Sequence, residues 1–253
     1  MKKAIFAALL TALLLASSSA QDKNWTTWTK AEAEKILNDS AWGQTQTDTD
    51  TSEMMYSPTS QSGTSTSTRS GVMGTTTDRQ SVNNSRAAQG AKNQAISINY
   101  HVRLLSAKPV RQALKRVIEL TQKNPDKELT DGLQSFVERD FSEFIVVSVA
   151  FDSSDGRFSG PAMQAFASGT IGTFKTKTYL ERKDGKRVFL MGYQAPINDG
   201  LGAKFIFPRI VDEKKFLNAE SGWVRFYSEV SGQIKLNVTY KMSDMMYNGQ
   251  LEY

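Results

Sequence analysis

A run of eight residues near the middle of the chain is apolar on both of its faces. In Phe144-Ile145-Val146-Val147-Ser148-Val149-Ala150-Phe151 only Ser148 is polar. Successive side chains of a strand point to opposite faces of a sheet, so such a run has to be covered on both sides. It predicts a central strand with helices on one face of its sheet and a further layer on the other.

The segment before this run predicts a second strand and a pair of helices. From Ile96 to Leu104 apolar and polar residues alternate, which is typical of a strand with one buried face. Pro109 opens a helix with an apolar stripe, and Asn124-Pro125 ends it and caps a second helix that reaches about Val137. We expect the two helices to form an antiparallel hairpin packed on the sheet.

The N-terminal residues carry the pattern of a cleavable signal peptide. Lys2 and Lys3 are followed by an apolar run from Ala4 to Ala16 and by the small residues Ser17-Ser18-Ser19-Ala20. This order of charged, apolar and small residues directs export across a bacterial inner membrane. We expect cleavage after Ala20 and a mature protein that is periplasmic or secreted.

Composition changes sharply twice after the signal peptide. Thr29 and Glu32 form the capping pattern of a short helix that ends near Asn38, and residues 41–56 are Thr-rich and alternating, which is typical of an exposed edge strand. Residues 57–93 are almost entirely small or polar, with too few apolar side chains to offset the entropy of ordering them. We therefore expect a signal peptide at 1–20, an N-terminal helix and edge strand at 21–56, a disordered low-complexity insert at 57–93 and an α+β domain at 94–253.

Turn signals place several strands in the C-terminal part of the chain. Asp184-Gly185 separates two strand-like runs and favours a two-residue turn, and Asn248-Gly249 predicts another tight turn. For the strands around Ser231-Gly232, pairing Phe226 with Leu236 requires a three-residue loop with Gly232 left-handed at a bulge. We expect this bulged register.

Charge and cysteine content exclude several classes of function. The chain has no cysteine, which excludes disulfides, thiolate metal sites and catalytic thiols. Lys2 and Lys3 supply two of the +5 formal charges, which leaves +3 on the mature chain and does not favour nucleic acid. No later stretch approaches the ~18 consecutive apolar residues of a spanning helix. We expect no nucleic-acid partner, no cofactor and no transmembrane helix in the mature chain.

Motifs for common enzyme chemistry are missing. His101 is the only histidine, and the strand alternation places it on a polar face, where we expect a structural role. A zinc site rich in histidine is excluded by this count, and there is no nucleophile elbow, Walker A loop or Gly-x-Gly-x-x-Gly motif. We assign no catalytic, cofactor-binding or metal-binding residue.

Aspartates at strand ends leave one enzymatic alternative open. Asp152, Asp155 and the pair Asn198-Asp199 lie at predicted strand ends or loops, where the two carboxylates of a glycosidase could meet. Aspartate also favours turns at such positions for its own backbone hydrogen bonds. Two carboxyl groups about 5–10 Å apart in a deep cleft would favour a hydrolase, and a flat or grooved surface would favour a binding protein.

The predicted Asp-Gly hairpin gathers four basic residues at its tip: Arg182, Lys183, Lys186 and Arg187. A two-residue loop places Lys183 opposite Lys186 and Arg182 opposite Arg187, and like charges directly opposite each other destabilise a sheet. An anionic partner would relieve this repulsion, whereas a solvated tip is the alternative. We hypothesise that the tip binds an anionic glycan, an envelope surface or a protein partner.

Two blocks of the sequence carry a resemblance to other proteins. The first is the Trp25–Trp42 stretch with Lys30-Ala31-Glu32-Ala33-Glu34-Lys35-Ile36-Leu37-Asn38-Asp39-Ser40. The second is Tyr179-Leu180-Glu181-Arg182-Lys183-Asp184-Gly185-Lys186-Arg187, which runs on to Ile197-Asn198-Asp199-Gly200-Leu201-Gly202-Ala203-Lys204-Phe205. Both resemble a group of uncharacterised secreted proteins of soil bacteria. The group has no assigned activity, so the resemblance implies secretion and transfers no catalytic residue.

The sequence predicts the α+β fold class, with a mainly antiparallel sheet, a packed helical hairpin, a short N-terminal helix and a disordered Ser/Thr-rich insert. The function that we expect is that of an exported, non-enzymatic binding or structural module, envelope-associated or secreted. The alternative is a carboxylate-dependent hydrolase that acts on polysaccharide.

Overall fold

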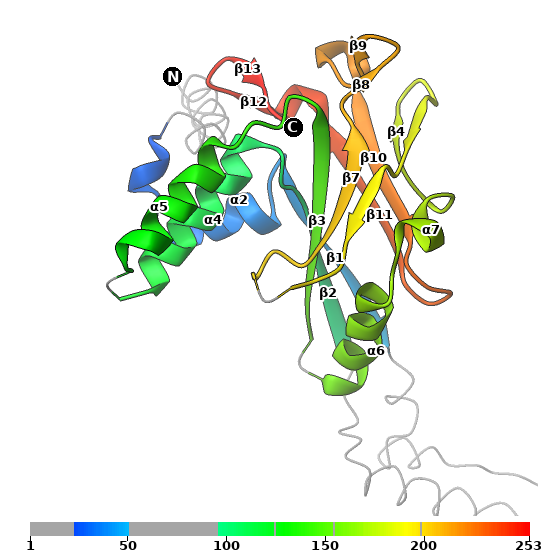
Figure 1. Ribbon diagram of the computed structural model, residues 1–253, viewed down its shortest axis with the longest axis horizontal. Coiled ribbons are helices and arrows are strands. Elements are labelled where there is room, and N and C mark those ends of the chain that lie inside the picture. The colour runs from blue at the N-terminus through cyan, green and yellow to red at the C-terminus, as the bar shows by residue number, and fades with distance from the viewer. Residues whose placement is uncertain (1–22, 51–95, 124, 154, 198) are drawn as a thin grey trace, which may run out of the picture. The chain divides into compact units, whose positions relative to one another are not determined.

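The computed structural model describes residues 23–50, 96–123, 125–153, 155–197 and 199–253. Within them the chain forms helices and mostly antiparallel sheets, so the predicted α+β class is confirmed (Figure 1). The described residues divide into two compact units: the larger takes those in 23–46, 100–151 and 161–253, and the smaller those in 47–50, 96–99 and 152–160. The predicted signal peptide at 1–20 and insert at 57–93 lie outside the described residues.

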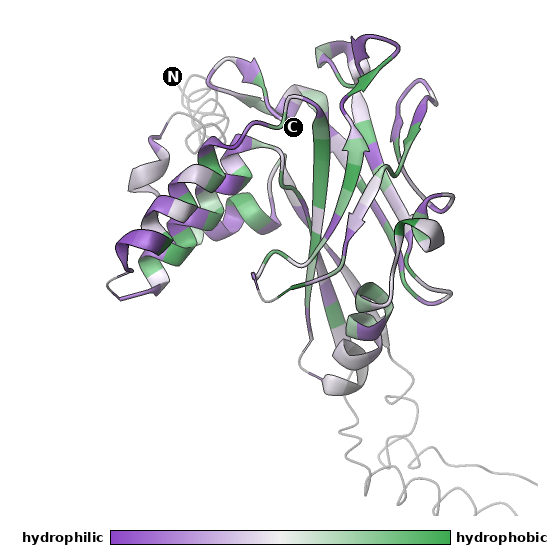
Figure 2. Ribbon diagram, viewed as in Figure 1, coloured by the Kyte–Doolittle hydropathy of each residue, from purple (hydrophilic) through white to green (hydrophobic). Residues whose placement is uncertain are grey.

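The larger sheet has five strands in the order β1-β2-β3-β7-β6. Its central strand β3 pairs antiparallel with β7, with Val147 opposite Phe205. The side chains from Ile145 to Val149 are all buried, so the prediction of a central strand is confirmed. Figure 2 shows the apolar residues that follow one another along β3. The five strands are β1 (Gly43–Asp50), β2 (Ile96–Leu104), β3 (Phe144–Ser153), β6 (Gly192–Gln194) and β7 (Ala203–Pro208).

A second sheet of four strands packs against the first. Its order is β11-β10-β4-β5, and every second side chain of β10 and β11 is buried. The ring of Phe226 on β10 lies 5.5 Å from that of Phe205 and 6.2 Å from that of Phe207, both on β7. The inner faces therefore form a sandwich core. The strands are β4 (Thr178–Arg182), β5 (Arg187–Phe189), β10 (Trp223–Glu229) and β11 (Lys235–Lys241).

Glutamines of β1 protect the edge of the second sheet. Gln44 donates its amide to the carbonyl of Thr239 at 2.8 Å, and Gln46 donates to the carbonyl of Lys235 and accepts from the backbone of Asn237. Because β11 is an edge strand, these bonds occupy backbone groups that would otherwise remain open to another chain. The predicted edge strand is confirmed as far as Asp50, and residues 51–56 lie outside the described residues.

Three helices pack side by side (Figure 1). They are α2 (Lys30–Asn38), α4 (Lys108–Thr121) and α5 (Lys127–Glu138). The capping box of α2 is confirmed, because Thr29 and Glu32 exchange their hydrogen bonds, and this lowers the pKa of Glu32 to about 2. The helical hairpin of α4 and α5 is also confirmed, but Asp126 rather than Asn124 caps α5, by accepting from the backbone of Leu129. In the described part of the chain, no helix is long and apolar enough to cross a membrane.

Several short elements complete the fold. Asn248 and Gly249 both have positive φ and join β12 to β13, so the predicted tight turn is confirmed. Asp212 and Glu213 make a similar turn between β8 and β9. The short elements are η1 (Trp25–Thr27), α6 (Gly156–Ala167), α7 (Ile171–Phe174), β8 (Ile210–Val211), β9 (Lys214–Lys215), η4 (Ala219–Ser221), η5 (Met242–Asp244), β12 (Met246–Tyr247) and β13 (Gln250–Leu251).

The predicted register of β10 and β11 is wrong by two residues. Phe226 lies opposite Val238 rather than Leu236, and Gly232 is not among the glycines with positive φ. The loop instead runs from Val230 to Ile234, both of which are buried, and the backbone of Val230 donates to the carbonyl of Ile234 at 2.9 Å. The longer loop therefore places two apolar side chains in the core. An even shift keeps the same residues on the buried face.

Candidate functional site

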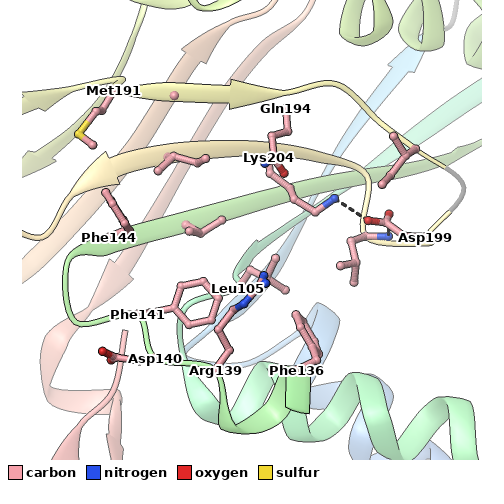
Figure 3. Close-up of a pocket in the computed structure, with 15 residues that line it drawn as sticks. Leu105, Phe136, Arg139, Asp140, Phe141, Phe144, Met191, Gln194, Asp199 and Lys204 are labelled. Carbon is pink, nitrogen blue, oxygen red and sulfur yellow. Dashed lines mark hydrogen bonds and ion pairs between the residues drawn. The ribbon is translucent and has the colours of Figure 1, made fainter. Parts of the chain in front are cut away.

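A groove with a volume of about 620 Å³ lies on one face of the larger sheet, beside the end of α5 (Figure 3). Its residues come from strands β3, β6 and β7, from the end of α5 and the chain after it, and from the residues that follow β2 or precede β6 and β7. All of them belong to the larger of the two units. Most of the side chains that line it are apolar, and the polar ones are Arg139, Asp140, Gln194, Asp199 and Lys204.

The floor of the groove is set by the register of three strands. Ile206 on β7 lies opposite Val146 on β3 and opposite Gly192 on β6, so the three residues form one row. A Cβ atom at Gly192 would lie 3.3 Å from the side chain of Ile206, so a larger residue would press on this floor. Phe144 continues the floor along β3. The result is an apolar surface that runs across the three strands.

An ion pair between the buried Lys204 and the exposed Asp199 closes one end of the groove. The ammonium of Lys204 lies 2.6 Å from a carboxylate oxygen of Asp199 (Figure 3). The other oxygen of Asp199 accepts from the backbone of Leu201, which fixes the loop that carries it. Lys204 is buried in the sheet, and Gln194 lies opposite it on β6. This end therefore offers a fixed cation, a fixed carboxylate and an amide beside an apolar floor.

The wall opposite is held by a buried arginine. Arg111 on α4 donates to the carbonyls of Leu105, Ser106, Val137 and Arg139. Burial lowers the pKa of Arg111 to about 10, and it stays charged at neutral pH. Its guanidinium also lies 4.7 Å from the centre of the Phe141 ring, which lines the groove. One side chain therefore ties the end of α5 and the following residues to the chain before α4.

Asp140 sits near this wall and is fixed as a carboxylate. Ser142 donates both its hydroxyl, at 2.7 Å, and its backbone N–H, at 2.8 Å, to Asp140. These bonds lower the pKa of Asp140, and the nearby positive charge of Arg209 lowers it further. A carboxyl group whose pKa is lowered is ionised at neutral pH and is a poor proton donor.

No family model matches the chain, and comparison with curated proteins and with solved structures finds no match. The chemistry of the groove must therefore be argued from its own residues.

The basic hairpin forms, but its register differs from the prediction. Glu181, not Arg182, lies opposite Arg187, and the backbone N–H of Arg182 donates to the carbonyl of Lys186. The loop is thus the three residues Lys183-Asp184-Gly185, with Gly185 at positive φ. The predicted pairs Lys183/Lys186 and Arg182/Arg187 are therefore wrong: Arg187 pairs with Glu181, and Arg182 forms an ion pair with Asp184. Binding of an anion by Arg182, Lys183, Lys186 and Arg187 stays a prediction.

The two lysines of this hairpin give the sharper test. They are exposed, whereas Arg182 also donates to the carbonyl of Phe216 and Arg187 holds Glu181. We expect Lys183→Gln/Lys186→Gln to elute earlier from heparin at low salt, because exposed charges attract a polyanion until salt screens them. The matched control is Lys214→Gln/Lys215→Gln on the β8–β9 hairpin, also exposed. Equal elution of the two variants would show that the tip is only solvated.

The other candidate residues from the sequence, His101 and the loop aspartates, make hydrogen bonds or ion pairs within the fold. His101 is half-buried, and its Nδ1 lies 3.0 Å from the hydroxyl of Thr45. In the smaller unit Asp152 accepts from the amide of Asn99, and the backbone of Asp155 donates to Ser153. Asn198 lies outside the described residues, and Asp199 lines the groove. Among the residues described, no group of three or more histidines and carboxylates could hold a metal ion.

Sequence reasoning missed most of the groove. The sequence pattern indicates Asp199 as a loop carboxylate, but it does not indicate the partner Lys204 or the wall residue Phe141. The sequence offers one local signal: Phe141 follows two charged residues in the connection between a helix and a buried strand, where an aromatic ring favours an apolar surface. The surface against which Phe141 packs depends on Arg111. Arg111 is distant in the sequence and belongs to no recognisable motif.

Proposed function

We propose that the protein is an exported, non-enzymatic binding module whose groove holds the apolar part of a small amphipathic ligand. Two apolar side chains at the groove support this most directly: Met191 is 49% exposed and Ile197 is 66% exposed. A cavity of about 620 Å³ is within the ~300–1,000 Å³ of small-molecule sites, which are mostly apolar with a few fixed polar groups. The signal-peptide pattern of residues 1–20 supports export.

The polar groups of the groove favour binding over hydrolysis. Asp199 is engaged by Lys204 at 2.6 Å, and Asp140 has a lowered pKa because Ser142 donates to it twice. A glycosidase needs one carboxyl group that keeps its proton at working pH and gives it to the leaving group. Neither carboxylate of the groove is arranged for that task. Both are arranged to hold charge in place beside an apolar surface.

An environment-sensitive dye tests the groove directly. We expect 1-anilinonaphthalene-8-sulfonate to bind the folded protein with a rise in fluorescence, and Met191→Gln/Ile197→Gln to weaken that binding about fivefold, since two partly buried apolar contacts are worth about 1 kcal/mol. A medium-chain fatty acid and an alkylamine carry opposite charges. Whichever of the two displaces the dye in a saturable way identifies the charge of the ligand.

The chain offers a close control for this experiment. Met163 and Ile171 are 50% and 42% exposed and do not line the groove. Met163→Gln/Ile171→Gln should leave dye binding unchanged. If both double variants lose binding equally, the dye reports general apolar surface and the proposal fails.

A further inference from the structure

The outer face of the four-stranded sheet carries aromatic rings where a face open to solvent usually carries only polar residues. Alternate side chains of β10 and β11 are buried against the larger sheet, and the others point outward. The outward residues of β11 are all exposed, whereas Tyr227 on β10 and Tyr179 on β4 are half-buried. The composition of this face is not explained by packing inside the sandwich.

Three of the rings form a row across adjacent strands, the aromatic row of Tyr227, Tyr179 and Phe189. Tyr227 lies opposite Tyr179, and Tyr179 lies opposite Phe189. Their ring centres are 5.1 Å and 6.0 Å apart, and Phe189 is 46% exposed. Aromatic faces carry negative partial charge and attract groups with positive partial charge, such as polarised C–H bonds. The guanidinium of Arg187 already lies 4.3 Å from the centre of the Tyr179 ring, so Tyr227 and Phe189 are the rings that suit a ligand presenting C–H groups.

Charged groups form a second row beside the rings, the ion-pair row of Arg225, Glu181 and Arg187. Arg225 donates to one oxygen of Glu181 at 2.8 Å, and Arg187 donates to the other. Burial alone would raise the pKa of Glu181, but the two guanidinium groups lower it overall. The row thus presents fixed donors next to a fixed acceptor. Hydroxyl groups, which both donate and accept, match such a surface.

The net charge of this face is positive. Its basic side chains outnumber its carboxylates, which are Glu181 and Glu229. The basic residues are Lys177, Arg187, Arg225, Lys235 and Lys241. Lys177 is paired with Glu229 at 3.1 Å, whereas Lys235 and Lys241 are exposed at the two ends of β11. An excess of one sign attracts polymers of the other sign.

We infer that this outer face binds an acidic polysaccharide. The aromatic row contacts the C–H faces of the sugar rings, and the ion-pair row hydrogen-bonds to their hydroxyl and carboxylate groups. Lys235 and Lys241 attract the charge of the polymer. The inference goes beyond the proposed function and does not depend on it, because the groove lies on the other sheet.

The same features favour a sugar polymer over a single-stranded nucleic acid. Base stacking and a basic surface would also attract nucleic acid. However, two carboxylates lie within this face, and both arginines of the ion-pair row are already engaged by Glu181. A phosphate backbone gains from cations without nearby carboxylates, whereas a hydroxyl-rich chain can use both kinds of group.

Titration calorimetry with polygalacturonate tests the inference on the whole protein. We expect binding that weakens as salt rises, and Tyr227→Thr/Phe189→Thr should weaken it about tenfold. Threonine keeps the strand propensity at both positions. The control Ile210→Thr/Met246→Thr removes two other exposed apolar side chains and should bind as the parent does. Dye binding in the groove should be unchanged in both variants, which separates this site from the proposed function.

A second variant covers the case in which the ring substitutions prevent folding. Lys235→Gln/Lys241→Gln changes only exposed positions and should reduce both the affinity and its salt dependence. Tighter binding of an oligothymidylate than of polygalacturonate would overturn the inference in favour of nucleic acid. No binding of polygalacturonate, or ring variants that bind as the parent does, would overturn it outright.

Discussion

Replacing Arg111 by methionine is expected to lower the free energy of unfolding by about 3 kcal/mol or more. The substitution leaves carbonyls of the chain before α4 and of the end of α5 without the donor that they share. Each buried polar group that loses its partner costs ~1–3 kcal/mol, and three of the four bonds are buried, those to Leu105, Ser106 and Val137. The same change should weaken dye binding in the groove, because Phe141 loses the guanidinium against which it packs.

A second arginine of α4 provides the control for this prediction. Arg116 donates to one carbonyl, that of Trp28, at 2.7 Å. Arg116→Met should therefore cost about 1 kcal/mol and leave dye binding intact. Chemical denaturation measures the loss of unfolding free energy in both variants. Dye binding to the folded protein then reports on the groove. If the two variants lose the same stability, Arg111 does not hold the wall in the way its hydrogen bonds indicate.

The parts of the fold that follow from local pattern could be predicted from the sequence. The run from Phe144 to Phe151, apolar on both faces, forms the central strand β3. The capping pattern of Thr29 and Glu32 marks the start of α2. In each case the residues that decide the structure are adjacent or a few positions apart. The interactions that decide these elements form within the segment itself, so the elements can be predicted without knowledge of the rest of the chain.

Register was less predictable because turns compete with packing. At Asp184-Gly185 the chain uses a three-residue loop with Gly185 at positive φ, which lets Arg187 pair with Glu181 instead of facing another cation. At Ser231-Gly232 the longer loop buries Val230 and Ile234. Both outcomes depend on partners across the sheet or in the core beneath it. Turn propensity alone does not contain that information.

The groove illustrates the same limit at the level of a site. Lys204 becomes a site residue because Asp199 is brought to it by the loop before β7, and Phe141 because Arg111 holds its connection. Neither pair forms a motif in the sequence. The aromatic row was equally hidden, since Tyr179, Phe189 and Tyr227 meet only when three strands are in register.

Gly202→Ala is expected to lower the free energy of unfolding by about 3 kcal/mol or more, whereas Gly200→Ala two positions earlier should cost only about 1 kcal/mol. Both glycines have positive φ, 77° at Gly202 and 72° at Gly200, so alanine pays a similar backbone cost of ~1–2 kcal/mol at either position. At Gly200 an added Cβ meets nothing within 4 Å, but at Gly202 it would lie 2.1 Å from the carbonyl oxygen of Val149. Because Val149 belongs to the central strand, its backbone cannot move without disturbing the sheet on both sides, and overpacking adds to the cost. Chemical denaturation of the two variants measures the difference in unfolding free energy. Equal losses would mean that the backbone of β3 moves to accommodate the new methyl group.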